Sequence, residues 1–325
     1  MTIRDLLIYT GLYRPYVNYK FLPDENNIEV LNFYPTKLQE LWHYRYVMHH
    51  FRDLVTPENT LLIGSVFGPK RKLKLSKSHI KMFYTGENVK RFPDYLDQCK
   101  KFADIAIAFD YADTDEYQRF PIWLEYFFEP DSTPASIRKE LAEFVTTYCP
   151  DNERKFASLV CSHDKGKLRT ILFHAMSTID RVDSGGRYLN NTNALQEEFH
   201  DDKARFIGQY KFNICPENTD RDGYVTEKVF QAIRSNTIPI YWGGLNNPEP
   251  QVLNKDAILF YDGPGSMPGL LRQIEELHRN PKLFSEFLAQ PKFQPHADEY
   301  IIHLFDSLHR KMKKVLTKKS GIIVP

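Results

Sequence analysis

The chain has 325 residues, of which 42% are hydrophobic and 14% aromatic, and this composition indicates an ordered globular protein. Its length exceeds the usual size of a single hydrophobic core and predicts two domains. The formal net charge is only +1, from 43 Lys and Arg against 42 Asp and Glu. No overall field therefore favours nucleic acid, and an anionic ligand requires a local cluster of cations.

The first half of the chain alternates short apolar strands with helices. Strands rich in β-branched and aromatic residues, each followed by polar residues or glycine, are expected at 60–67, 80–86 and 102–110. Prolines bracket one amphipathic helix between Pro130 and Asp151. We therefore expect a boundary near residue 150, with domains at 1–150 and 151–325.

The second half alternates strands and helices more regularly. Strands are predicted at 156–162, 210–215, 237–243 and 257–262. Helices are predicted at 168–179, before His200 and at 224–235. This alternation indicates a parallel sheet with helices on both faces, so the sequence predicts the α/β class with two Rossmann-like domains.

The tail from Phe305 to Ser320 interleaves six cations with the apolar residues Leu308, Met312, Val315 and Leu316. One interpretation is a surface helix whose last cations complement the helix dipole. The other is a basic C-terminal helix that makes peripheral contact with an anionic membrane. Each cation near a membrane contributes only about 1 kcal/mol, which favours the surface helix.

Residues 217–228, ENTDRDGYVTEK, place six charged side chains between two apolar segments. They follow the strand at 210–215 and enter a helix, a position where open parallel sheets bind ligands. Helix N-termini at that edge attract anions. An anion site is one interpretation of the stretch, and a solvated capping box is the other. Asp222 or Thr219 is the expected N-cap, and Gly223 permits a tight entry.

Three side chains of this stretch suit a nucleotide. Lys228 in the first helical turn is unfavourable for the helix dipole unless it meets an anion such as a diphosphate. Glu227 can accept hydrogen bonds from the hydroxyl pair of a ribose. Asn218 carries both a donor and an acceptor, which suits a base edge or a sugar.

Arg187 follows a glycine pair in DSGGR. Glycines permit close approach of the backbone to a phosphate, and a guanidinium binds phosphate oxygens in bidentate fashion. Together with Lys228, Arg187 would neutralise a nucleoside diphosphate without a metal; an arginine in a surface loop is the alternative. Two D-x-D patterns, at 113–115 and 220–222, are interpreted as turn or cap residues, because two carboxylates alone do not specify a metal site.

Glu87 follows Gly86 at the carboxyl end of the strand at 80–86. A carboxylate displayed on such a turn can act as a general base. Asp110 and Glu125 stand at the ends of elements in the same way, and a solvated carboxylate is the alternative for all three.

Residues 211–244, KFNICPENTDRDGYVTEKVFQAIRSNTIPIYWGG, closely resemble the fucosyltransferase motif of glycosyltransferase family 10. KMFYTGEN, DIAIAFD, RFPIWLEY, RKFASLVCS and DSGGR match in the same order. Ordered matches over this length are much more specific than a single motif. The likeness is to the soluble bacterial members of the family.

This resemblance implies an inverting α1,3-fucosyltransferase of GT-B type, with two Rossmann-like domains that face each other across a cleft. It implies an N-terminal acceptor-side domain and a C-terminal domain that binds GDP-fucose. L-Fucose would pass to the 3-hydroxyl of GlcNAc in an N-acetyllactosamine-like glycan, as in Lewis X antigens. Glu87 matches the general base. The donor-binding positions are Arg187 and Lys228 for the diphosphate and Asn218, Tyr224 and Glu227 for ribose and guanine.

The resemblance implies no required cofactor, with a divalent metal at most stimulatory. The alternatives are a transferase for another GDP-sugar, an α1,4-linkage specificity, and a catalytically silent protein that binds a nucleotide or glycan.

The cellular compartment is predicted from cysteines and from apolar runs. Cys99, Cys149, Cys161 and Cys215 lack metal-ligand spacing and are expected to be buried free thiols in a reducing compartment. The apolar run from Leu6 to Tyr9 is too short for a signal peptide or a membrane span. The expected location is the cytoplasm, with peripheral contact at the inner membrane face as the alternative for the basic tail.

Overall fold

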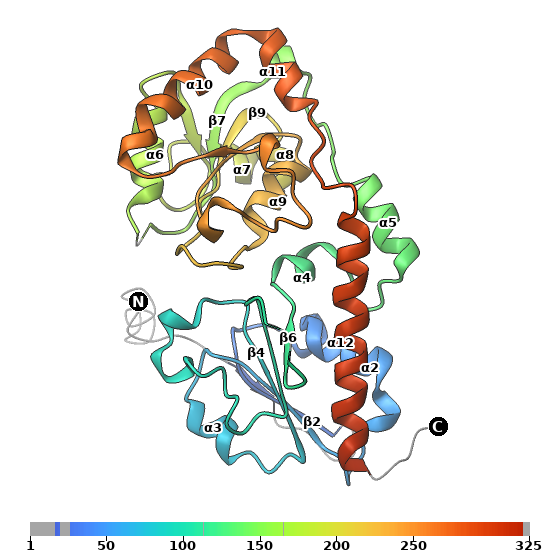
Figure 1. Cartoon of the computed structure of the whole chain (residues 1–325). Helices are drawn as coiled ribbons and strands as arrows, with labels where there is room; N and C mark the ends of the chain where they lie inside the picture. Colours follow the sequence, from blue (N-terminus) through green and yellow to red (C-terminus); the bar gives the residue numbers. More distant parts are fainter. Residues whose placement is uncertain (1–16, 20–26, 113, 165, 321–325) are drawn as a thin grey trace. The chain divides into compact units, whose positions relative to one another are not determined.

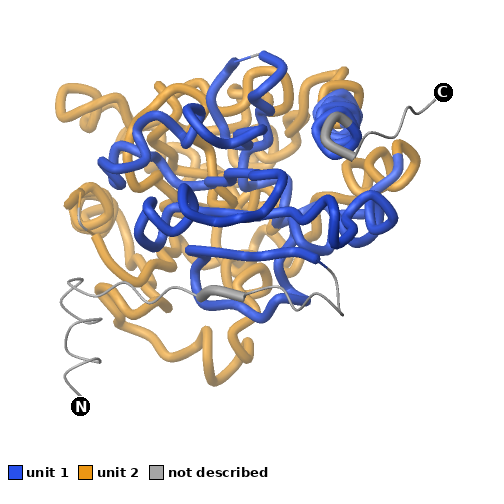
Figure 2. The backbone as a smooth tube through the Cα atoms, turned by 90° about the horizontal axis from the view of Figure 1, so that it is seen from below, with its two compact units in different colours: residues 1–133, 302–325 blue, residues 134–301 orange. Residues whose placement is uncertain are grey.

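The computed structural model describes residues 17–19, 27–112, 114–164 and 166–320. It divides the chain into two compact units, coloured separately in Figure 2. Unit 1 comprises Met1–Thr133 with Ile302–Pro325, and unit 2 comprises Pro134–Ile301. The division thus falls earlier than the boundary predicted near residue 150. The last segment of the chain also belongs with the first unit, because its apolar side chains pack there.

Unit 1 contains a six-stranded sheet whose strands follow chain order. They are β1 (Val17–Tyr19), β2 (Ile28–Phe33), β3 (Leu61–Gly64), β4 (Ile80–Tyr84), β5 (Ile105–Ala108) and β6 (Tyr117–Arg119). β1 is antiparallel to β2, and all later neighbours are parallel. The three strands predicted in this half correspond to β3, β4 and β5. β3 and β5 are apolar runs and β4 carries one lysine, as expected for strands that are largely buried on both faces.

Four helices accompany this sheet in the described part of unit 1: α2 (Trp42–His50), α3 (Lys70–Leu75), α4 (Trp123–Phe127) and most of α12 (Ala297–Ser320). Short 3-10 helices lie at Leu38–Glu40, Arg52–Leu54, Val89–Arg91 and Pro93–Tyr95. A buried cluster that includes Leu73, Phe83 and Tyr95 packs α3 and the segment after β4 against the sheet.

Unit 2 contains a five-stranded parallel sheet in the order β11-β10-β9-β7-β8. The strands are β7 (Lys155–Leu159), β8 (Val182–Ser184), β9 (Tyr210–Ile214), β10 (Ile238–Tyr241) and β11 (Leu259–Phe260). The parallel sheet predicted for this half is confirmed. β8, with the sequence VDS, was not predicted, because three residues with a central aspartate give no apolar run.

Helices lie on both sides of β7 and β9 in Figure 1. In the described residues of unit 2 they are α5 (Pro134–Ala142), α6 (Leu168–Met176), α7 (Ala194–Glu197), α8 (Lys203–Ile207), α9 (Glu227–Arg234), α10 (Met267–Arg279) and α11 (Pro281–Leu288). Short 3-10 helices lie at Asp151–Glu153, Gly244–Asn246, Lys255–Ala257 and Pro264–Ser266. One buried cluster joins the sheet to α6, α10 and α11, and another joins α7 and α8 to Tyr210.

The apolar side of α12 is buried within unit 1. Leu308, Met312 and Leu316 are inaccessible to solvent or nearly so. The cation Lys311 donates to the Tyr117 carbonyl at 2.8 Å, and Lys314 lies 2.6 Å from a carboxylate oxygen of Asp115. A membrane-bound helix would insert these apolar side chains into lipid, but here they already pack against protein. The packing therefore favours the surface-helix interpretation of the tail.

No helix in the described residues is long and apolar enough to cross a bilayer. The apolar run at residues 6–9 lies outside them. All four cysteines are free, and three are buried while Cys161 is partly exposed.

Candidate functional site

The carboxyl edge of the unit 2 sheet carries the charged stretch 217–228. β9 and β10 are adjacent and parallel, and α9 connects them, so the predicted β-α-β arrangement is confirmed. Because all five strands are parallel, the segments after β7, β8, β9 and β10 emerge at the same edge of the sheet. This edge therefore gathers most of the side chains predicted to bind a nucleotide.

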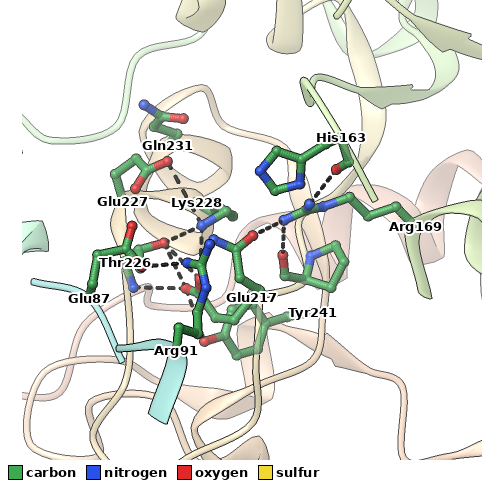
Figure 3. Close-up of polar contacts among 12 residues, drawn as sticks. Glu87, Arg91, His163, Arg169, Glu217, Thr226, Glu227, Lys228, Gln231 and Tyr241 are labelled. Carbon is green, nitrogen blue, oxygen red and sulfur yellow. Dashed lines mark hydrogen bonds and ion pairs between the residues drawn. The ribbon is translucent and has the colours of Figure 1, made fainter. Parts of the chain in front are cut away.

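Glu217 organises this stretch, although the sequence did not single it out. Its carboxylate accepts hydrogen bonds from the Thr226 backbone N–H at 2.7 Å, the Thr226 hydroxyl at 2.7 Å and the Tyr241 hydroxyl at 3.4 Å. The side chain has no exposed surface, and Lys228 supplies its counter-charge (Figure 3). A buried carboxylate needs such compensation, so Glu217 fixes the path of the stretch into α9.

Lys228 makes contacts within the protein that the sequence did not predict. Its ammonium donates to Glu217 at 2.9 Å and to the Thr226 hydroxyl at 2.6 Å, and it lies 4.0 Å from a carboxylate oxygen of Glu227. Burial lowers the pKa of Lys228, but the two carboxylates raise that pKa by more, so Lys228 remains a cation. An ammonium has three donors, so one N–H is left for a ligand. The side chain is 21% exposed.

The entry to α9 differs from the prediction in one respect. The helix begins at Glu227 with Thr226 at its N-cap, so the predicted caps Asp222 and Thr219 are wrong. The Thr226 hydroxyl donates to Glu217 rather than capping the helix. Gly223 has φ of 70°, a left-handed conformation that glycine adopts without strain, as the predicted tight entry requires.

Asn218 is held by Arg169, a residue near the start of α6 that the sequence did not single out. One guanidinium nitrogen donates to the Asn218 side-chain oxygen at 2.7 Å and to the Pro216 carbonyl at 3.3 Å. The other terminal guanidinium nitrogen donates to the His163 carbonyl at 2.7 Å (Figure 3). Arg169 is buried and thus adds a cation to this edge. Its place in the first turn of a helix was the detectable signal, because the dipole reasoning applied to Lys228 also applies there.

Arg187 is exposed and makes no hydrogen bond or ion pair with any residue that the structure describes. The preceding glycines serve contacts within the protein. A Cβ on Gly186 would lie 2.3 Å from the carbonyl oxygen of Cys161 and 2.5 Å from its nitrogen. Gly186 therefore lets the chain after β8 approach the backbone after β7. This role differs from the close approach to phosphate that the sequence suggested.

Tyr224, the remaining predicted donor-binding residue, is only 1% exposed. Its ring belongs to the packed interior of unit 2 and presents little surface to a nucleotide. Glu227 is half-buried at the first position of α9. Burial raises the pKa of Glu227, whereas the charges of Lys228 and Lys203 lower it by more, so the side chain is a carboxylate at neutral pH.

In unit 1, Glu87 lies just beyond the carboxyl end of β4, as predicted. Its backbone N–H donates to the Thr85 hydroxyl at 3.0 Å, and a carboxylate oxygen lies 2.5 Å from Arg91 Nη1 (Figure 3). The Glu87 side chain is 27% exposed. A Cβ on Gly86 would lie 2.6 Å from the side chain of Ile122, so only glycine fits before Glu87. The turn thus displays a carboxylate that solvent and ligands can reach.

The two competing carboxylates of unit 1 lie in different surroundings. Asp110 is occupied by the Gln98 side-chain amide at 2.5 Å. Burial raises the pKa of Glu125 to about 8, so at neutral pH it largely keeps its own proton. His43 Nδ1 lies 3.7 Å from Glu125, but burial lowers the pKa of His43 to about 3 and leaves that ring neutral. Glu87 is partly exposed and is paired with Arg91.

The D-x-D patterns are engaged in local contacts. Asp220 accepts a hydrogen bond from the Leu245 backbone N–H at 2.7 Å, and Asp115 pairs with Lys314. Asp113 lies outside the described residues. Within the described ranges, no group of three or more His, Cys, Asp or Glu side chains is arranged to hold a metal ion.

Solved structures of α1,3-fucosyltransferases share this fold. One aligns over 97% of both chains with a TM-score of 0.60 and 22% identity. Another, solved with GDP-fucose, aligns over 87% of this chain and 89% of its own with a TM-score of 0.59 and 23% identity. The predicted α/β fold class of GT-B type is confirmed.

Two family models cover most of the described sequence. The C-terminal model of glycosyltransferase family 10 (fucosyltransferase) matches residues 149–312. The N-terminal domain model of alpha-(1,3)-fucosyltransferase FucT matches residues 28–126. The chain belongs to glycosyltransferase family 10.

Curated relatives carry several different activity names. Alpha-(1,3)-fucosyltransferase FucT of Helicobacter pylori is 33% identical over 208 residues, which is 56% of this chain and 41% of that protein. GDP-fucose protein O-fucosyltransferase 3 of Xenopus laevis is 31% identical over 115 residues, or 33% of this chain and 24% of that protein. Alpha-(1,4)-fucosyltransferase of Arabidopsis thaliana is 29% identical over 133 residues, or 35% of this chain and 33% of that protein. The chain thus spans less than half the length of each of these relatives.

Proposed function

We propose that this chain is an inverting α1,3-fucosyltransferase that transfers L-fucose from GDP-fucose to the 3-hydroxyl of a GlcNAc residue in a glycan. The observation that carries the proposal is the group of cations at the carboxyl edge of the unit 2 sheet. Lys228 has one N–H left for a ligand, and Arg187 has no partner among the described residues. Membership of glycosyltransferase family 10 supports a sugar nucleotide as the anion that they bind.

In this proposal the donor nucleotide lies along the start of α9. Lys228 and Arg187 bind the diphosphate, and Glu227 accepts hydrogen bonds from the ribose hydroxyls. Asn218 turns its amide oxygen toward Arg169, so its NH₂ group is available for the base or the sugar. Tyr224 is buried and contributes mainly by packing beneath the site.

Glu87 acts as the general base of the proposed reaction. Its carboxylate takes the proton from the acceptor hydroxyl, and the hydroxyl oxygen attacks the anomeric carbon on the face opposite the diphosphate. The bond between that carbon and the phosphate oxygen breaks, and GDP leaves. A β-linked donor thus gives an α-linked product.

Charge on the departing GDP is balanced by Lys228, Arg187 and the N-terminus of α9. No general acid is needed, because a diphosphate stabilised in this way is a good leaving group. We propose that no cofactor is required and that a divalent metal is at most stimulatory.

The acceptor and the linkage are the finer parts of the proposal. A Lewis X-type acceptor related to N-acetyllactosamine is the first choice, in line with the name of the Helicobacter pylori relative. The names of the Arabidopsis and Xenopus relatives indicate that α1,4 linkages and protein acceptors occur among similar proteins. The α1,4 linkage and another GDP-sugar donor are therefore the alternatives to be tested.

The decisive experiment incubates the purified protein with GDP-fucose and N-acetyllactosamine. The expected products are GDP and a fucosylated trisaccharide, with the linkage assigned by NMR. Absence of turnover with every type 1 and type 2 acceptor would overturn the proposal. GDP release that depends on acceptor would exclude a silent binding protein, and a thermal-shift comparison of GDP-fucose, GDP-mannose and GDP would identify the donor.

A further inference from the structure

Lys203, the first residue of α8, is half-buried, and its ammonium makes one hydrogen bond within the described residues. Its one hydrogen bond within the described residues joins Nζ to the Gln231 side-chain oxygen at 3.2 Å. No carboxylate that the structure describes lies within ion-pair distance of it. Two of its three N–H groups therefore have no protein acceptor in the described chain. A partly buried ammonium whose one direct hydrogen bond is to a neutral amide can take a further acceptor.

The position of Lys203 places this ammonium at the candidate nucleotide site. Gln231 lies four residues after Glu227 on α9, so the two side chains share one face of that helix. Burial lowers the pKa of Lys203, and the charges of Glu227, Lys228 and Arg169 act on that pKa as well. Lys203 therefore lies on the same side of α9 as the carboxylate assigned to the ribose.

Several cations gather at this edge of the sheet. Three cations, Arg169, Lys203 and Lys228, come together there. Glu217 is bonded to Lys228 and Thr226, and the charges of Glu227 and Lys203 act on each other's pKa. Arg169 is bonded only to neutral oxygens. An anion is the ligand that these cations favour, because Lys203 and Lys228 keep N–H groups without a partner in the described residues.

We propose that Lys203 is a further donor-binding residue, whose ammonium binds a phosphate oxygen of the nucleotide beside Glu227. This inference rests on the proposed use of a GDP-sugar. Lys228 and Arg187 bind the diphosphate from the start of α9 and from the segment after β8. Lys203 adds a third contact from α8, across the face of α9 that carries Glu227 and Gln231.

The test compares the binding of GDP and of guanosine, which lacks the phosphates, by isothermal titration calorimetry. Lys203→Gln is expected to weaken GDP binding about 10- to 100-fold, the usual effect of removing a charged hydrogen bond. It should leave guanosine binding unchanged and make GDP binding less dependent on salt. Lys203→Met keeps the aliphatic stem in its half-buried place without the charge, and it should show the same pattern even if the glutamine variant is poorly folded.

Lys211→Gln is the matched control. Lys211 is also a partly buried lysine of unit 2 whose pKa burial lowers, but it donates to the His278 carbonyl at 2.8 Å, away from α9. This variant should bind GDP as the original protein does. If the original protein binds GDP and both Lys203 variants bind it equally tightly, the inference is wrong while the proposed function stands. An equal loss for GDP and guanosine would show that Lys203 only docks α8 on α9, and an original protein that fails to bind GDP would overturn both proposals.

Discussion

The ammonium of Lys228 lies 2.9 Å from the carboxylate of Glu217, whose side chain has no exposed surface. The same carboxylate accepts from Thr226 and Tyr241, so α9, the segment before it and β10 are joined at one buried group. This arrangement orients Lys228 before any ligand binds. Preorganised cations lose less conformational entropy when an anion arrives, which increases affinity.

Glu217→Gln is expected to reduce the free energy of unfolding by about 3–5 kcal/mol, because it leaves the Lys228 ammonium without its buried counter-charge. Urea denaturation followed by circular dichroism measures this loss. Glu275→Gln removes a carboxylate from an exposed pair with Arg279 and should cost about 1 kcal/mol or less. Equal losses for the two variants would contradict the organising role of Glu217.

Glu87→Gln is expected to lower kcat about 10²- to 10⁴-fold, because an amide cannot accept the proton of the acceptor hydroxyl. GDP binding should be unchanged, since Glu87 is not among the donor-binding residues. Steady-state kinetics and titration calorimetry on the same preparation measure the two quantities. Glu129→Gln alters an exposed carboxylate of unit 1 and should retain full activity. Undiminished kcat in the Glu87 variant would mean that another group is the base.

The sequence predicted the elements that have a local signal, namely apolar runs or helical spacing bounded by polar residues, glycine or proline. β3 and β5 are apolar runs, and in β4, β7 and β9 the apolar residues outnumber the polar ones. Glu227 and Lys228 could be assigned because they begin the amphipathic helix that follows β9. β2, with the sequence IEVLNF, was not predicted. Local pattern was therefore sufficient for most strands of unit 2 and for the central strands of unit 1.

The missed site residues act through partners far away in the sequence. Arg169 bonds Asn218 across 49 positions, and Glu217 bonds Tyr241 across 24. No local pattern reports such pairs, because they exist only after the parallel strands bring their carboxyl ends together. The N-cap of α9 was misplaced for a related reason: Thr226 is engaged by Glu217, a tertiary contact that the capping rules do not include.

Gly186→Ala is expected to destabilise unit 2 by about 1–3 kcal/mol. The new methyl group would lie 2.3 Å from the backbone of Cys161, and a backbone segment cannot move aside as a flexible side chain can. The displaced segment carries Arg187, so GDP binding should weaken as well. Denaturation and calorimetry measure both effects. Gly265→Ala has no heavy atom within 4 Å of its new methyl group and should shift stability by about 0.5 kcal/mol or less. A Gly186 variant as stable as this control would show that the two segments move apart at little cost.

Glu125 makes stability depend on pH in a direction that its raised pKa determines. The pKa is about 8 in the folded state, against an ordinary value of 4.5. Between these values the folded protein binds one proton more than the unfolded chain, so the free energy of unfolding falls as pH rises. His43 acts in the opposite direction, because burial lowers its pKa to about 3 from 6.5, but its contribution ends near pH 6.5.

The interval from pH 6.5 to 8 therefore isolates Glu125. Relative to Glu125→Gln, the original protein is expected to lose up to about 1.4 kcal/mol of stability per pH unit there, the slope for one bound proton. Urea denaturation at steps of half a pH unit measures the difference between the two proteins. Glu129→Gln, at an exposed position of unit 1, should run parallel to the original protein. Parallel curves for the Glu125 variant would mean that this carboxyl is ionised at neutral pH, and it would then rank beside Glu87 as a candidate base.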